Sequence, residues 1–93
     1  MTTRELRRVT LDGELTIMTA AGHKDRLLAA LAGSGGLRVD LSAVEEVDTA
    51  GLQVLLLARR EAEQLSLPFE LAAPAPDVAA VLALAGLTAA EEE

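Results

Sequence analysis

The sequence contains no cysteine, tryptophan or tyrosine, and Phe69 is its only aromatic residue. Without cysteine, the chain has no disulfide, thiol nucleophile or thiolate metal ligand. Without a set of aromatic side chains, it has no platform on which single-stranded nucleic acid could stack. Positive charge is also scarce, because 8 Lys and Arg residues stand against 15 Asp and Glu residues, for a net charge of -7. Such a surface repels nucleic-acid phosphates and anionic lipids, so we expect no direct nucleic-acid partner.

Long apolar runs are missing as well. No unbroken run approaches the roughly 20 residues that cross a bilayer as a helix. The polar residues 1–5 lead into no apolar signal core. We therefore expect a soluble cytoplasmic protein that does not insert into a membrane.

Apolar side chains are abundant in spite of these gaps, since 51% of the 93 residues are hydrophobic. That content argues against disorder, and the length favours one domain over residues 1–93, with residues 88–93 as a flexible acidic tail. A chain of this size buries roughly 60–65% of the surface that its unfolded form exposes.

The start of the chain predicts a β-hairpin. Residues 6–11 have strand character, and residues 15–18 alternate as a second strand. Asp12-Gly13 between them is a strong two-residue turn signal, because both central residues of the favoured turn need positive φ.

A helix is predicted after the hairpin. Thr19 is placed to cap a helix that begins near Ala20, and Leu27 and Leu31 recur in it at helical spacing. The glycine-rich residues 33–36 end this helix as a turn. They are not a phosphate loop, which would follow a strand and open a helix.

The middle of the chain predicts a strand and the longest helix. Residues 37–42 alternate with period two, so one face of the strand is buried and helices lie mainly on one face of the sheet. Residues 43–47 are expected to be a short connection. Residues 49–65 form a helix with one apolar arc. The arc contains Gly51, Val54, Leu55, Ala58, Ala62 and Leu65.

The end of the chain predicts one more strand and helix. Pro68 breaks the helical pattern, residues 69–71 start a strand, Asp77 caps a short helix and Gly86 stops it. The expected fold is therefore α/β, with a four-stranded mixed sheet in the order β-β-α-β-α-β-α. Three strands pair in parallel, and the hairpin adds an antiparallel first strand.

Thr49 is the first candidate for a functional residue. It lies at the start of the long helix, beside Asp48 and shortly before Gly51. Its hydroxyl could simply cap the helix by accepting a backbone N–H, or it could accept a phosphate. The helix amino end would stabilise the added charge, whereas Glu45, Glu46 and Asp48 would repel it. A phosphorylated site would then reject a partner that docks on the neutral form.

Neighbouring residues complete a predicted partner-binding surface. Leu52 lies at the edge of the apolar arc and Leu56 outside it, so both are expected to be at least partly exposed. Gly51 has no side chain and would let a partner backbone approach closely. The predicted surface consists of Asp48, Thr49, Ala50, Gly51, Leu52 and Leu56.

Other candidate sites are weaker. Asp40, Glu45, Glu46 and Asp48 lack calcium-loop spacing, so no metal site and no cofactor is expected. His23 is the single histidine and is expected to be a solvated helix residue. No catalytic motif is present, although a hydrolase that uses Asp48 and Thr49 remains an alternative.

The central pattern resembles a known family. Val-Asp-Leu-Ser at residues 39–42, a five-residue link and Asp-Thr-Ala-Gly-Leu at residues 48–52, followed by an apolar helix, resemble the STAS domain family. This family includes anti-sigma factor antagonists and the cytoplasmic domains of sulfate transporters. The similarity extends over nearly the whole chain and implies a STAS-like fold.

The resemblance also implies a non-catalytic binding module. Antagonists of this family bind an anti-sigma factor that is also a Ser/Thr kinase, and they are phosphorylated on the hydroxyl residue after the aspartate of the motif. Here that residue is Thr49. In its unphosphorylated form such an antagonist sequesters the kinase and frees the sigma factor.

Three residues depart from the sporulation-type antagonists. Those proteins have Ser where this chain has Thr49, a second hydroxyl where it has Ala50, and an acid where it has Thr16. The motif is also similar to that of stand-alone chemotaxis-linked STAS proteins and of the small cytoplasmic subunit of phospholipid-transport ABC complexes. In the last case the threonine would dock on an ABC transporter ATPase without phosphorylation.

Overall fold

The computed structural model describes residues 6–89 of the chain. Strands and helices alternate along it in the order β-α-β-α-β-α. The elements are β1 (Arg7–Leu15), α1 (Ala20–Leu31), β2 (Leu37–Val47), α2 (Thr49–Gln64), β3 (Phe69–Ala72) and α3 (Pro76–Leu84).

The three strands form one parallel sheet in the order β1-β2-β3. The expected four-stranded mixed sheet is therefore wrong. Gly13 has the positive φ that its sequence context predicted, +71°, but the chain does not reverse there. The register of β1 against β2 shifts between Gly13 and Glu14, where β2 contains one extra residue, Glu45. Gly13 therefore lies opposite a bulge in β2, and β1 runs on to Leu15. A positive φ at a glycine occurs within a strand as well as in a hairpin turn, and the local sequence does not distinguish the two.

The second strand is longer than the sequence predicted. Residues 43–47, expected to be a connection, belong to β2, because β1 also continues and pairs with them up to Leu15 and Val47. Residues 16–18, expected to end the second strand, form with Thr19 the turn that leads into α1. Both strands consequently end beside the start of α2.

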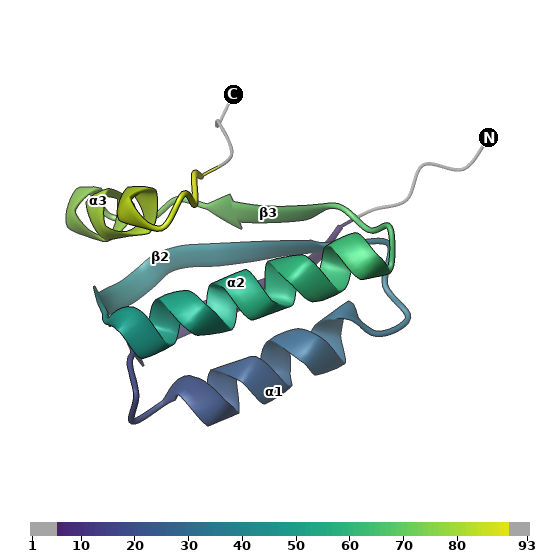
Figure 1. The fold of residues 1–93 in the computed structure, drawn as a ribbon, viewed down its shortest axis with the longest axis horizontal. Helices are drawn as coiled ribbons and strands as arrows, with labels where there is room; N and C mark the ends of the chain where they lie inside the picture. Colours follow the sequence, from purple (N-terminus) through teal and green to yellow (C-terminus); the bar gives the residue numbers. More distant parts are fainter. Residues whose placement is uncertain (1–5, 90–93) are drawn as a thin grey trace.

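Helices α1 and α2 lie next to each other over the sheet (Figure 1). The core between them and the sheet consists of aliphatic side chains from every element. Those that are fully buried include Leu11, Leu15, Leu27, Leu31, Leu37, Val39, Leu41, Leu55 and Leu82. At roughly 25 cal/mol per Å² of apolar surface, this burial is the main stabilising term of the fold. The other face of the sheet is polar, and Arg38 there forms an ion pair with Glu70 at 2.6 Å.

Three helix ends differ from the sequence expectation. Thr19 occupies the N-cap position of α1, but its hydroxyl makes no capping bond to the helix. Ala75, not Asp77, is the N-cap of α3, with Pro76 in the first turn. Leu65, assigned to the buried arc of α2, follows the last turn of that helix and is 49% exposed.

All strands point in the same direction, so their carboxyl ends meet at one end of the molecule. Helix α2 starts at this end, and α3 lies there too (Figure 1). No helix within residues 6–89 has the length and apolar character that a membrane span needs. Most of the expected acidic tail, residues 90–93, lies outside the described residues.

Candidate functional site

Asp48 links the start of α2 to the turn after β1. Its Oδ1 accepts the backbone N–H of Gly51 at 3.0 Å, as an N-cap does, and its Oδ2 accepts the N–H of Ile17 at 3.0 Å. The N–H bonds of Gly51 and Ile17 lower the pKa of the Asp48 carboxyl below its usual range, because both favour the charged form. Asp48 is therefore ionised at neutral pH and holds two segments of the chain together.

Thr49 is exposed as the first residue of α2. Capping by its hydroxyl, one of the two roles considered for it, is not seen because Asp48 is the cap. Within residues 6–89, no group makes a hydrogen bond with the Thr49 hydroxyl. The side chain is therefore accessible at a helix amino end, where backbone N–H groups favour negative charge.

Gly51 is buried, and its close neighbour is the backbone of Leu15. A Cβ at position 51 would overlap the Leu15 carbonyl group. The same carbonyl oxygen accepts the N–H of Asp48 at 3.2 Å. The sequence predicted that a partner backbone would approach Gly51, but in the structure the end of β1 in the same chain lies there.

The turn between β1 and α1 is held by its own hydrogen bonds. The Thr19 hydroxyl donates to the carbonyl of Glu14 at 2.7 Å and accepts the N–H of Thr16 at 3.1 Å. The N–H of Thr19 donates to the carbonyl of Thr16 at 2.9 Å. Residues 16–19 therefore have a fixed conformation beside Asp48, a feature that the local sequence did not predict.

His23 is buried, contrary to the expectation of a solvated residue. Its Nε2 lies 2.9 Å from the carbonyl oxygen of Glu14, so Nε2 carries the proton and donates it to that oxygen. His23 is thus a structural support for the turn.

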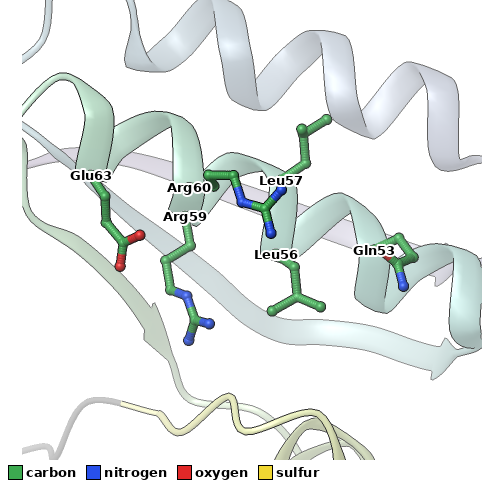
Figure 2. Close-up of a pocket in the computed structure, with 6 residues that line it drawn as sticks. All are labelled: Gln53, Leu56, Leu57, Arg59, Arg60 and Glu63. Carbon is green, nitrogen blue, oxygen red and sulfur yellow. The ribbon is translucent and has the colours of Figure 1, made fainter.

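Helix α2 presents three leucines on its outer side, Leu52, Leu56 and Leu57. Leu52 and Leu56 are half-buried and pack against the core, in agreement with the sequence prediction of partial exposure. Figure 2 shows Leu56 and Arg59 on the flank nearer α3, and Leu57, which is 41% exposed, on the flank nearer α1. These side chains line a shallow pocket of about 220 Å³ together with Gln53, Arg60 and Glu63. The outer side of α2 therefore mixes apolar side chains with charged ones of both signs.

Negative charge concentrates at the end of the molecule that contains Thr49. The carboxyl ends of the strands and the first turn of α3 contribute Asp12, Glu14, Glu45, Glu46, Asp48 and Asp77. No Lys or Arg occurs in residues 9–23, 39–58 or 72–93. The Thr49 site consequently lies in a strongly negative environment.

These carboxylates do not form a metal site. Within residues 6–89, no group of three or more His, Asp or Glu side chains is arranged to hold a metal ion. Asp40 lies instead on the polar face of the sheet. Hydrogen bonds from the backbone and side chain of Ser42 lower the pKa of Asp40, and Arg38 and Arg8 contribute further.

A family model described as "Mlab, STAS domain" matches residues 2–89. The chain belongs to the STAS family. No match is found among curated proteins. Solved STAS structures do match. A serine-to-glutamate variant of Moorella thermoacetica RsbS is 33% identical, with a TM-score of 0.72 over 92% of this chain and 79% of RsbS.

The fold of this STAS domain is also that of the anti-sigma factor antagonist SpoIIAA. The unphosphorylated form of SpoIIAA gives a TM-score of 0.73 at 21% identity, over 100% of this chain and 86% of SpoIIAA. The phosphorylated form from Bacillus gives 0.71 at 22% identity, over 99% and 88% of the two chains. The chain is therefore a STAS module like those of the antagonist proteins.

Proposed function

We propose that this STAS domain is a non-catalytic regulatory protein that binds a kinase-type anti-sigma factor and is switched by phosphorylation of Thr49. The observation that carries the proposal is the exposed hydroxyl of Thr49, which is not used for capping because Asp48 caps α2. The solved structures of SpoIIAA in unphosphorylated and phosphorylated forms support this mode of regulation for the fold.

The proposed docking surface is centred on Thr49, with Ala50, Leu52 and Leu56 beside it on α2. Leu52 and Leu56 offer partly exposed apolar surface, which is the kind of contact that stabilises protein interfaces. Asp48 and Gly51 contribute indirectly to the docking surface, because they fix the start of α2 against β1.

A phosphate on Thr49 would add between one and two negative charges to an end of the molecule that is already acidic. The amino end of α2 stabilises the phosphate locally, so the fold tolerates it. The phosphate is larger and far more strongly hydrated than the hydroxyl, so the partner that fitted the uncharged Thr49 and the leucines beside it dissociates.

The test is the state of Thr49 in the cells that make the protein. A tagged chain is purified from its native host under conditions that support growth and under stress, and its intact mass is measured. We expect a fraction that carries one phosphate in the wild type and in Thr88→Val, and none in Thr49→Val. Thr88 is an exposed threonine on another part of the surface, so it serves as the matched control. Absence of phosphate in every condition, or a phosphate that persists in Thr49→Val, would contradict phosphorylation at this site.

The second candidate is a small cytoplasmic subunit of a phospholipid-transport ABC complex. The family description "Mlab, STAS domain" favours it, and so does Ala50, which leaves Thr49 without a second hydroxyl beside it. In this case Thr49 docks on an ATPase without being modified. Recovery of an ABC ATPase with the wild-type chain, its loss in Thr49→Val and the absence of phosphate would together favour this candidate. Both candidates act in the cytoplasm, where ATP is available to the partner.

A further inference from the structure

Ile17 and Met18 are two large apolar side chains that the fold leaves in solvent. They are 72% and 84% exposed, although they are neighbours in a tight turn. Scattered single exposed apolar residues are common on protein surfaces, but adjacent ones of this size mark an interaction site more often.

Their exposure does not come from a loose loop. The N–H of Ile17 donates to Asp48, and the two bonds between Thr16 and Thr19 close the turn around both residues. The turn therefore holds the two side chains outward in one orientation. A partner would pay little conformational entropy to bind them, because the backbone is already ordered.

The same turn is adjacent to the Thr49 site. Asp48 immediately precedes Thr49 in the chain and bonds directly to Ile17, so the two surfaces share one anchoring residue. On the side of the turn away from Thr49, Met18 lines an open, mainly apolar groove of about 770 Å³ between β1 and α1. The other lining residues are Asp12, Gly13, Glu14, Thr19, Gly22, His23 and Arg26.

The charge around this apolar surface has one predominant sign. Glu14 and Asp12 line the groove, and Asp48 and Glu46 lie at the neighbouring strand end. Arg26, which also lines the groove, donates its Nη2–H to the Thr10 carbonyl at 3.2 Å. A surface with an apolar centre and an acidic rim is complementary to a partner with an apolar centre and Lys or Arg around it.

We propose that Ile17 and Met18 are the apolar anchors of the docking face and that they select a protein partner whose contact surface is apolar and basic. This rests on the proposed function, because it extends the Thr49 surface across the Asp48 contact and names the chemistry of the partner. The anchors set affinity, and the acidic rim sets the rate of association and its dependence on salt.

Two synthetic helical peptides test the proposal without a known partner. Both carry the same leucines on one face, with Lys on the other face of one peptide and Glu on the other face of the second. Each is titrated into the 15N-labelled chain at physiological ionic strength, and amide shifts are followed by NMR. We expect the Leu/Lys peptide to shift residues 14–19 and 45–52, and the Leu/Glu peptide to shift neither.

The variants give the decisive comparison. Ile17→Ser combined with Met18→Ser should weaken binding of the Leu/Lys peptide about tenfold or more. Leu84→Ser is the matched control, because Leu84 on α3 is 87% exposed, and it should change the affinity less than about twofold. All three residues are exposed, so the amide spectra of both variants should show the native fold. Unchanged affinity in the Ile17/Met18 variant, or shifts that centre on α3, would overturn the proposal.

The outcome is separable from that of the proposed function. If Thr49→Val loses the natural partner while the Ile17/Met18 variant retains it, the docking function stands and the anchor proposal fails. If the Leu/Lys peptide binds at residues 14–19 but Thr49 is never modified, the anchor proposal stands and phosphorylation fails.

Discussion

Gly51 shows most directly how a single residue builds the site. Its missing side chain lets the first turn of α2 lie against the carbonyl of Leu15, and the bond from Asp48 to that carbonyl fixes the contact. The position is helical, so the glycine is not needed for its backbone conformation. It is needed because no Cβ fits between the helix and the strand.

Gly51→Ala should therefore destabilise the protein by about 2 kcal/mol or more, because β1 or α2 must shift to relieve the overlap. Gly22→Ala is the control, since Gly22 also lies in a helix but a Cβ there meets nothing within 4 Å. That change should stabilise by about 0.5–1 kcal/mol through helix propensity. Urea unfolding followed by far-UV circular dichroism measures both, as the chain has no tryptophan to serve as a fluorescent probe. Equal effects of the two alanines would mean that the helix and the strand are not in close contact at position 51.

At the scale of elements, α2 determines which residues belong to the site. Its apolar arc buries Val54, Leu55 and Ala58 against the sheet, and this orientation leaves Leu52 and Leu56 partly exposed. The helical period was therefore sufficient to predict the faces of α2. It failed only at Leu65, where the helix has ended and the arc no longer applies.

Three aspartate substitutions test the orientation of α2. Leu55→Asp places a charge in the core and should cost about 3–5 kcal/mol, enough to unfold a domain of this size. Leu56→Asp should cost about 1 kcal/mol and Leu57→Asp less than about 0.5 kcal/mol, following their exposure. Thermal unfolding would rank the three variants. Loss of folding in Leu56→Asp, with Leu55→Asp tolerated, would mean that α2 packs on the sheet through Leu56 and not through Leu55.

At the scale of the whole molecule, the parallel sheet gathers like charges at one end. Residues far apart in the sequence, such as Glu14, Glu46 and Asp77, come to the same end because all strands point the same way. Arg26 lies beside Asp12 and Glu14, but the arginines of β1 and β2 lie toward the amino ends of the strands, so carboxylates predominate at this end. We expect repulsion between these carboxylates to lower the stability of the fold. In the proposed function, the same negative charge serves recognition of the partner.

Raising NaCl from about 0.02 M to about 0.5 M should therefore increase Tm by about 2–5 °C, because salt screens repulsion between exposed charges beyond a few ångströms. A Glu45→Gln/Glu46→Gln variant should have a higher Tm at low salt and a smaller increase with added salt. Differential scanning calorimetry would measure both proteins. An identical salt response in the two proteins would show that repulsion between Glu45, Glu46 and their neighbours does not destabilise the fold.

The sequence by itself determined the helices, the glycine-rich turn, the position of Thr49 and the membership of Leu52 and Leu56 in a partly exposed surface. Each of these depends on local chemistry or on the helical period, which is present in a short stretch of residues. The tertiary structure alone decided that β1 continues through Gly13, because parallel pairing with β2 keeps the strand extended up to Leu15. It also decided that Asp48 holds the turn after β1 and that His23 is buried, because their partners, Ile17 and Glu14, lie in other segments of the chain. The exposed pair Ile17 and Met18 belongs to this second group. Expected to end a strand, these residues lie outward because the turn that holds them is fixed by contacts distant in the sequence.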